Sequence, residues 1–393
     1  MSSSTELPVL KLSSKLPDVG SSIFYEMTRL AQQHQAINLG QGFPGFQPDA
    51  RLVQAVHQAM LDGHNQYAPM AGVPALREEL SRLCERKNGR RYEPETEITI
   101  TSGATEALYA VISAVVWPED EVIVFDPAYE SYVPAIRANG GQPVHIPLSY
   151  PDYRIDWNKV KRLITSKTRA IILNNPHNPS GQLLDAADIE ALRSITRDSD
   201  MLIISDEVYE HIVFNGQPHL SMAQYDDLAA RSFVIGSLGK TLHTTGWKIG
   251  YCMAPAALTQ ELRRFHQQIV FAVSTPMQVG TAAYLASQPT LAQDLKTLFG
   301  QKRDRFNRLM KGSRLKPIPS QGSYFQLYSF RELEGLSALS DVEFCRQLIS
   351  QHGVAAIPIS VFYRDQEDQK VIRLCFAKED AVLDAAAERL CAV

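Results

Sequence analysis

Continuous apolar segments in the middle of the chain constrain most strongly what this protein can fold into. Each segment contains three or four consecutive apolar residues, with no alternation between apolar and polar positions. A strand of this kind is buried on both faces, which is typical of a parallel sheet covered by helices on both sides. The segments are 121–127 (EVIVFDP), 169–174 (RAIILN), 201–209 (MLIISDEVY), 231–240 (RSFVIGSLGK) and the shorter 249–255 (IGYCMAP).

Helical spacing between the apolar segments completes the pattern. Residues 185–200 (DAADIEALRSITRDSD) have the periodicity of an amphipathic helix. Strands that alternate with helices predict an α/β fold whose large, mostly parallel sheet carries helices on both faces. Ligands of such sheets bind beyond the carboxyl ends of the strands. Polar residues at these ends are expected to converge on one crevice, and they are Asn178, Asp206, Ser237 and Lys240.

The pattern changes after about residue 256. Long helical stretches follow, and then come strand-like segments at 324–330, 354–360 and 371–377. A chain of 393 residues is also long for a single core. We therefore predict a second, smaller α+β domain at the C-terminus, joined by the N-terminal segment. The first 15 residues are rich in Ser, Leu and Pro and are expected to form a loose arm.

Composition excludes several classes of function. The net charge is only −4 and no long Lys/Arg tract is present, so nothing points to nucleic acid or to an anionic membrane. The start lacks the apolar core of a signal peptide, and the apolar runs are too short to span a bilayer. No metal is expected, because no HExxH motif occurs and the cysteines lack zinc or redox spacing. Reduced thiols in a cytoplasm fit best, with cysteines at Cys84, Cys252, Cys345, Cys375 and Cys391.

Lys240 stands in the tripeptide Gly239-Lys240-Thr241, which is also how a nucleotide-binding phosphate loop ends. That loop reads G-x-x-x-x-G-K-[ST], so its first glycine would fall at position 234, which is Val234. The nearest glycine, Gly236, makes the loop two residues too short. The residues that follow are rich in Thr and Gly rather than helix-forming. The sequence therefore disfavours a nucleoside-triphosphate site.

The other interpretation of Lys240 is a Schiff-base lysine. A lysine amine condenses with an aldehyde cofactor such as pyridoxal phosphate, whose ring then serves as an electron sink. That cofactor makes independent demands on a protein. Its phosphate needs amide donors, hydroxyls and a cation, its ring nitrogen needs a carboxylate, its phenolic oxygen needs donors, and its ring face needs an aromatic side chain. The carboxylate of its substrate needs a positive fork, best supplied by arginine.

Candidates for the phosphate lie in two segments. A helix is expected to begin in TSGATEALYAV, where the amides of Gly103, Ala104 and Thr105 could hold a dianion with help from the helix dipole. Ser237 and Lys248 flank Lys240 and could reach the same phosphate. Each has an ordinary alternative. Thr101 or Ser102 could simply be an N-cap, Ser237 a turn residue and Lys248 a solvated surface lysine.

Candidates for the ring also exist. Asp206 ends a buried strand, where a carboxylate is costly unless it is paired, and a pyridinium would be such a partner. The alternative is a helix N-cap. Tyr209 and Asn178 could donate to the phenolic oxygen, and Tyr129 could stack on the ring. Their alternatives are a core tyrosine, a turn asparagine and simple core packing.

Arg373 is the candidate for the substrate carboxylate. It lies inside the apolar segment VIRLCFA. An arginine in a buried strand needs a carboxylate partner, which could be the substrate or another residue in a structural ion pair.

Together these motifs resemble the class I and II aminotransferases of pyridoxal-phosphate fold type I. The resemblance covers nearly the whole chain, from SIFYEMTRLAQQHQAINLGQGFP to VIRLCFAKED. Lys240 aligns with the lysine that forms the internal aldimine. The motifs follow in the family's order and spacing, as SGATEAL, FDPAYESY, NNPHNPSG, SDEVYEH, SLGKTLHTTGWKIGY and the late arginine.

Within the family the chain looks closest to the bacterial methionine aminotransferases and the kynurenine and glutamine-K type. NLGQGFPGF, NQYAPMAGVPALRE, HQQIVFAVSTPMQ and GVAAIPISVFY carry that impression. The resemblance implies that Gly42 holds the substrate carboxylate opposite Arg373, and that Tyr67 reaches the phosphate of the other subunit in a homodimer with shared active sites. It also implies a large cofactor-binding domain over 48–285 and a small domain built from 16–47 and 286–393.

The resemblance further implies ping-pong transfer of an amino group, through aldimine and ketimine, to a 2-oxo acid. Lys240 would be the catalytic base, with Asp206 and Tyr209 supporting the ring. No second arginine for a side-chain carboxylate is found in QIVFAVSTP, and Ile23, Phe24 and Phe271 are expected as apolar pocket walls. We therefore expect methionine, glutamine or aromatic donors, including kynurenine.

Two other functions stay open on the same scaffold. One is β-elimination, as by a cysteine-conjugate β-lyase, which uses the same lysine. The other is an effector-sensing regulator, which would need an added DNA-binding helix-turn-helix with a basic face. Only about 40 residues precede NLGQGFP and they hold no basic cluster, which disfavours the regulator.

Overall fold

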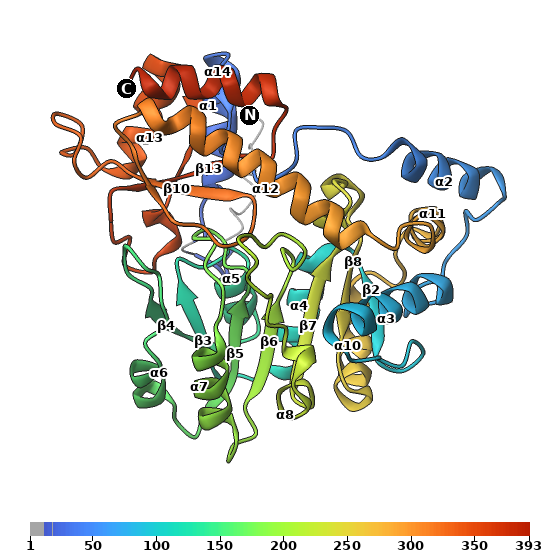
Figure 1. The fold of residues 1–393 in the computed structure, drawn as a ribbon. Helices are drawn as coiled ribbons and strands as arrows, with labels where there is room; N and C mark the ends of the chain where they lie inside the picture. The colour runs from blue at the N-terminus through green and yellow to red at the C-terminus, as the bar shows by residue number, and fades with distance from the viewer. Residues whose placement is uncertain (1–11, 18) are drawn as a thin grey trace, which may run out of the picture.

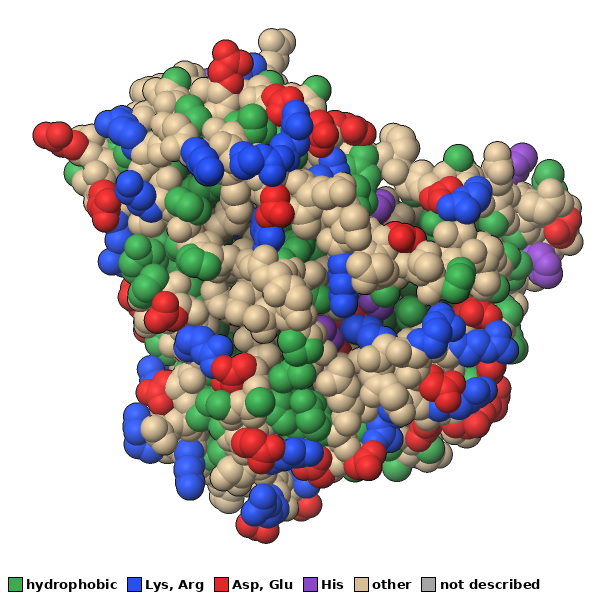
Figure 2. Space-filling model, in the orientation of Figure 1, with side chains coloured by type: hydrophobic (Ala, Val, Ile, Leu, Met, Phe, Trp, Pro, Cys, Tyr) green, Lys and Arg blue, Asp and Glu red, His purple; other side chains and the backbone are tan. Residues whose placement is uncertain are grey.

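The computed structural model describes residues 12–17 and 19–393, and most of the expected N-terminal arm lies outside this range. Figure 1 shows a large sheet with helices on both faces and, above it, a second group of strands and helices formed mainly by the end of the chain. On the face seen in Figure 2, basic and acidic side chains are interspersed. No helix in the described part of the chain combines the length and the hydropathy needed to cross a membrane.

The large sheet has the strand order β2-β8-β7-β6-β5-β3-β4. Strands β4, β3, β5, β6 and β7 pair in parallel, whereas β8 pairs antiparallel with both β7 and β2. The prediction of a mostly parallel sheet is confirmed. Its strands are β2 (Ile98–Thr101), β3 (Glu121–Asp126), β4 (Gln142–Pro147), β5 (Thr168–Asn174), β6 (Leu202–Asp206), β7 (Ser232–Ser237) and β8 (Gly250–Met253).

Helices cover both faces of this sheet, which explains why its strands are apolar throughout. In β3 the side chains of Val122 and Val124 pack on one face with α4 and α5, while Ile123 and Phe125 face the core that includes α6 and α7. A polar residue at any of these positions would lose its water without gaining a partner. The helices of this part are α2 (Ala50–Leu61), α3 (Pro74–Asn88), α4 (Gly103–Val115), α5 (Tyr132–Ala138), α6 (Trp157–Leu163), α7 (Ala186–Thr196), α8 (Asp226–Ala229), α9 (Leu238–Thr241), α10 (Ala256–Ile269) and α11 (Thr275–Ala286).

The second group of strands forms an antiparallel sheet in the order β12-β13-β10-β9. Its strands are β9 (Lys316–Ile318), β10 (Phe325–Ser329), β12 (Ile357–Pro358) and β13 (Val371–Cys375). A separate parallel pair joins β1 (Ile37–Asn38) to β11 (Val354–Ala355), so the N-terminal segment pairs with a strand from the C-terminal part of the chain. The helices of the group are α1 (Ile23–Gln33), α12 (Leu291–Leu309), α13 (Asp341–His352) and α14 (Asp380–Cys391).

The structure differs from the sequence-based expectation in two places. The segment 354–360 was expected to be one strand, but the chain divides at Ala356 into β11 and β12, which belong to different sheets. An apolar run marks burial and does not show which neighbour each residue pairs with. After β7 the chain forms the short helix α9, although the Thr- and Gly-rich sequence there carries little helical signal.

The contact between α2 and α11 gives a test of the packing. A methyl group at Gly280 of α11 would lie 2.5 Å from the backbone of Val56 in α2, whereas one at Gly300 of α12 would meet nothing within 4 Å. We expect Gly280→Ala to lower the free energy of unfolding by about 1–3 kcal/mol, because the helices must separate. Gly300→Ala should raise it by up to about 1 kcal/mol through helix propensity.

Urea unfolding at one fixed protein concentration measures both variants. Equal effects of Gly280→Ala and Gly300→Ala would contradict the close approach of α2 and α11.

Candidate active site

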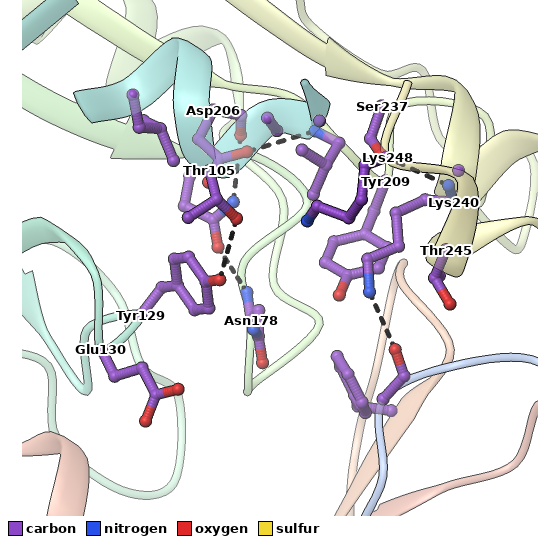
Figure 3. A pocket seen from close by; sticks show the side chains of 18 of the residues that line it. Thr105, Tyr129, Glu130, Asn178, Asp206, Tyr209, Ser237, Lys240, Thr245 and Lys248 are labelled. Carbon is purple, nitrogen blue, oxygen red and sulfur yellow. Dashed lines mark hydrogen bonds between the residues drawn. The ribbon is translucent and has the colours of Figure 1, made fainter. Parts of the chain in front are cut away.

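The carboxyl ends of the parallel strands meet at one edge of the large sheet. Register pairs Asn174 of β5 with Asp206 of β6, and Asp206 with Ile235 of β7, so these strands end side by side. A cavity of about 300 Å³ opens at this edge (Figure 3). The second sheet closes it from the other side, because Phe325 of β10 and Arg373 of β13 also line it. The expected convergence on one crevice is present.

Most of the predicted site residues line this cavity. It brings together residues from segments more than 300 positions apart along the chain, which sequence spacing alone cannot show. The predicted residues that line it are Phe24, Gly42, Gly103, Ala104, Thr105, Tyr129, Asn178, Asp206, Tyr209, Ser237, Lys240, Lys248 and Arg373.

Lys240 projects into the cavity from α9. This helix begins because the Ser237 hydroxyl, its N-cap, accepts a hydrogen bond of 3.3 Å from the Lys240 amide. The Lys240 ammonium donates to the carbonyl oxygen of Gly42 at 2.8 Å. Its Nζ atom lies 5.8 and 5.7 Å from the ring centroids of Tyr209 and Tyr324. Burial lowers the pKa of Lys240 to about 8, so the amine is still mostly protonated at pH 7 but loses its proton far more readily than an ordinary lysine.

Asp206 lies at the buried end of β6 and is only 4% exposed. Its carboxylate accepts a hydrogen bond of 2.5 Å from the Tyr132 hydroxyl and a longer one of 3.4 Å from the Val208 amide. Burial raises the pKa of Asp206 to about 6 despite these bonds. In the described part of the chain no cation lies within ion-pair distance of this carboxylate. A positively charged ligand atom would stabilise it.

The N-terminus of α4 forms a second corner of the cavity. The first amides of a helix have no acceptor within the helix, and Gly103, Ala104 and Thr105 are the first three residues of α4. Ser102 is the N-cap residue of α4, but its side chain makes no capping bond, so it does not occupy these amides. A methyl group at Gly103 would lie 3.1 Å from the Lys248 Nζ atom. Free amides beside an ammonium form a site for a phosphate.

Arg373 is the most deeply buried cation of the site, at 2% exposure. Its guanidinium donates to the side-chain oxygen of Asn178 at 2.9 Å and to the carbonyl oxygen of Gly40 at 3.0 Å. The rings of Phe325 and Phe24 lie 3.9 and 5.1 Å from it. Its Nε atom is buried without a hydrogen-bond partner. Because these acceptors are neutral, the alternative of a structural ion pair finds no carboxylate among the described residues.

The aromatic and amide candidates surround the same space. The Tyr129 hydroxyl lies 3.3 Å from the Thr105 hydroxyl, as Figure 3 shows, so its ring is held across the cavity from Lys240. Tyr209 is buried with its ring 5.1 Å from that of Tyr324. The side chain of Asn178 faces Arg373. The backbone N–H of Asn178 donates a hydrogen bond of 2.7 Å to the side-chain oxygen of Asn174.

Three predicted residues, Tyr67, Phe271 and Ile23, are not among the residues that line the cavity. Tyr67 is 84% exposed and its ring packs against that of Phe271, with 5.1 Å between the centroids. Ile23 is the first residue of α1 and packs against the core. Only its neighbour Phe24 faces the cavity.

Sequence reasoning missed several residues of the site. Tyr132 donates to Asp206, and the Tyr324 hydroxyl donates to the Gly42 carbonyl at 2.7 Å. Thr245 and Glu130 also line the cavity. The spacing of Tyr132, three residues after Tyr129 at a helix start, was the one available signal. The others depend on contacts between distant segments.

This donor set fits pyridoxal phosphate. Among residues 12–17 and 19–393, the buried Asp206 lacks a positive partner, the α4 amides and Lys248 lack an anion, and the Arg373 Nε atom lacks an acceptor. A pyridinium nitrogen, a phosphate and a substrate carboxylate would supply the three missing partners.

Comparison with known proteins agrees with this fit. The family model "Aminotransferase class I and II" matches residues 34–390. Methionine aminotransferase from Escherichia coli is 47% identical over 377 residues, which are 96% of this chain and 97% of that protein. Kynurenine–oxoglutarate transaminase 3 from Homo sapiens is 33% identical and covers 95% of this chain and 88% of its own length.

Solved structures show the same similarity in three dimensions. A crystal structure that identifies a methionine aminotransferase function in an Escherichia coli protein has a TM-score of 0.95 and 46% identity, and covers 98% of this chain and 100% of its own. N-succinyldiaminopimelate aminotransferase from Mycobacterium tuberculosis has a TM-score of 0.92 and 35% identity, with 97% and 100% covered. The chain therefore belongs to the class I and II aminotransferases, enzymes that depend on pyridoxal phosphate.

Proposed function

We propose that this aminotransferase moves an amino group from methionine, glutamine or an aromatic amino acid, including kynurenine, to a 2-oxo acid. The observation that carries the proposal is the cavity itself. It holds a lysine amine of lowered pKa between a buried carboxylate and a buried guanidinium, and neither of these has an ion-pair partner among the described residues. The names of the similar enzymes from Escherichia coli and Homo sapiens support the choice of donors.

Each group of residues in the cavity would bind a different part of the cofactor. Lys240 would hold pyridoxal phosphate through its amine, and the cofactor, when bound, withdraws electrons from the α-carbon of the substrate. Asp206 would keep a proton on the ring nitrogen, while Tyr209 and Asn178 donate to the phenolic oxygen and Tyr129 covers the ring. The phosphate would be held by Ser237, Lys248 and the first amides of α4.

Residues on the other face of the cavity would bind the substrate and transfer its proton. Arg373 would bind the α-carboxylate through two parallel hydrogen bonds, assisted by Gly42 and Asn178. Lys240 Nζ would take the proton from the α-carbon as a general base and return a proton as a general acid. A pKa near 8 suits both roles, because proton transfer is fastest when the pKa lies near the working pH.

The assembly and location of the enzyme are also proposals. We propose a homodimer in which Tyr67 reaches the phosphate of the partner's site, because Tyr67 and Phe271 form an exposed aromatic pair outside their own cavity. We propose a cofactor-binding domain over 48–285, with 16–47 and 286–393 forming the smaller one. The five cysteines are unpaired, which supports work in the cytoplasm.

The loaded enzyme mixed with methionine alone tests the donor. We expect the visible absorption of the lysine-linked cofactor to fall and the matching 2-oxo acid to appear. Lys240→Ala should lose both the visible band and turnover, because no other amine replaces Nζ. Lys167→Ala, an exposed lysine paired with Glu119, is the control and should behave as the wild type.

Glutamine and kynurenine follow in the same assay, and a cysteine conjugate tests for β-elimination through pyruvate release. A Lys240→Ala protein that keeps its band and turnover would overturn the assignment of the lysine.

The buried carboxylate of Asp206 predicts a pH dependence of stability. Its pKa is raised from 3.8 to about 6, so the folded cofactor-free protein loses stability as pH rises from about 4 through 6. Asp206→Asn removes this loss. We expect the variant to unfold with a free energy up to about 3 kcal/mol higher than wild type at pH 7.5, with the difference fading below pH 4, while turnover falls.

Asp49→Asn is the matched contrast. The Arg51 side chain lowers the pKa of Asp49 to about 2, so this charge stabilises the fold above pH 4 and the substitution should weaken it at neutral pH. Urea unfolding of cofactor-free protein at fixed concentration measures both. An Asp206→Asn protein that is less stable than wild type at pH 7.5 would show that the carboxylate has a partner after all.

Mixed dimers test the shared site. A dimer of one Lys240→Ala chain and one Tyr67→Ala chain contains one site with both defects and one with neither. Adding excess inactive Lys240→Ala chain to Tyr67→Ala protein, with time for exchange, should therefore raise the activity per Tyr67→Ala chain toward the wild-type value. No rise, with exchange verified by a tag, would show that Tyr67 does not serve a neighbouring site.

A further inference from the structure

One charged residue of the cavity has no part in the proposed function. Five charged side chains line it, and they are Glu130, Asp206, Lys240, Lys248 and Arg373. Four of them are accounted for by the ring nitrogen, the lysine linkage, the phosphate and the α-carboxylate. Glu130 remains, and it directly follows Tyr129 on the wall that Figure 3 shows opposite Lys240.

Glu130 is exposed at the rim of the cavity, and one hydrogen bond to its side chain is present there. Its Oε2 atom accepts a hydrogen bond of 2.8 Å from the Ser22 hydroxyl. Ser22 is the N-cap of α1, and its hydroxyl also accepts a hydrogen bond from the Phe24 amide at 3.3 Å. The Phe24 ring in turn faces the Arg373 guanidinium. The carboxylate therefore has a defined position next to the anchor for the substrate.

The charge of Glu130 reaches the substrate anchor. Burial lowers the pKa of the Arg373 guanidinium, and the negative charge of Glu130 acts in the opposite direction. A substrate whose α-carboxylate is bound by Arg373 and whose α-carbon faces Lys240 could extend its side chain along the part of the wall that holds Phe24 and Glu130. The end of that side chain meets an apolar ring and a negative charge.

No cation offsets this charge for a second substrate carboxylate. Lys240, Lys248 and Arg373 are the basic residues that line the cavity within the described chain, and all three are engaged. The surroundings of Tyr67, which would approach the partner's site with it, are 271–276 (FAVSTP) and contain no basic residue. A dicarboxylate would bring its distal charge toward Glu130 without compensation.

We infer that Glu130, positioned by Ser22, is a specificity-determining residue that excludes donors and 2-oxo acids with a second carboxylate. The same carboxylate accepts a hydrogen bond from a side chain that ends in an N–H group, as in glutamine or kynurenine, and tolerates the thioether of methionine. This inference rests on the proposed function and adds to it. The inference therefore predicts that the acceptor of the second half-reaction is a 2-oxo acid with one carboxylate, in contrast to the oxoglutarate in the name of the human relative.

Glu130→Gln tests the inference, because it keeps the shape and the acceptor but removes the charge. We expect kcat/KM for glutamate, aspartate and 2-oxoglutarate to rise about tenfold relative to methionine and its 2-oxo acid, the size expected for one charge pair near a protein surface. The value for methionine itself should stay within about twofold. Ser22→Ala should give a smaller rise, since the carboxylate then loses its fixed position.

Salt separates a charge effect from a change of shape. Raising the ionic strength from about 0.02 M to about 0.3 M shortens the screening length. It should therefore reduce the preference of the wild type for methionine over dicarboxylate substrates, and should leave the preference of Glu130→Gln unchanged. Glu119→Gln is the control, as its carboxylate is exposed and far from the cavity wall.

A Glu130→Gln protein that converts methionine as before, with unchanged preference and unchanged salt dependence, would overturn the inference alone. Failure of the wild-type enzyme to convert methionine, glutamine or kynurenine would instead overturn the proposed function. The two failures are therefore distinguishable in one set of assays.

Discussion

The register of the parallel strands β5, β6 and β7 is the constraint on which the site depends. Backbone hydrogen bonds place Asn174 opposite Asp206 and Asp206 opposite Ile235, so that the strands end together. Since side chains alternate across a strand, a slip of one residue in β6 would turn Asp206 to the opposite face of the sheet. The end of β7 then starts α9 through its N-cap Ser237, and this short helix carries Lys240 into the same space.

The site keeps charges that the protein alone does not neutralise. Asp206 and Arg373 are both buried, and their hydrogen-bond partners among the described residues are neutral groups. Burying a charge without an opposite charge costs several kcal/mol. A fold retains such residues at this cost when a ligand supplies the missing charges. Binding of the cofactor and of a substrate carboxylate then stabilises the folded state by mass action. The cost of the two unpaired charges also explains why the site would select ligands that carry opposite charges at these two positions.

Some residues of the fold and the site could be predicted from the sequence, and others could not. The strand ends could be predicted, because apolar runs mark burial and the polar residue that ends each run marks the edge of the sheet. Asp206 and Lys240 were found in this way. Tyr132 and Tyr324 were not, since their partners, Asp206 and Gly42, lie 74 and 282 positions away. The division of 354–360 between two sheets was missed for the same reason: burial can be read from one segment, but pairing depends on another.

Two of the contacts between the smaller group of strands and helices and the large sheet lie beside the place proposed for the substrate. One runs from Arg373 to Asn178, and the other from Ser22 to Glu130. On the inference above, both ends of a bound substrate would touch the boundary between the two parts of the chain, the α-carboxylate at the first contact and the side chain at the second. A ligand can shift an arrangement of two parts only by its differential affinity for the alternatives. A substrate that satisfies Arg373 but repels Glu130 would act on these two contacts in opposite directions, whereas one that suits both would stabilise both contacts. On the inference above, selection of the substrate thus depends on side chains that also join the two parts of the chain.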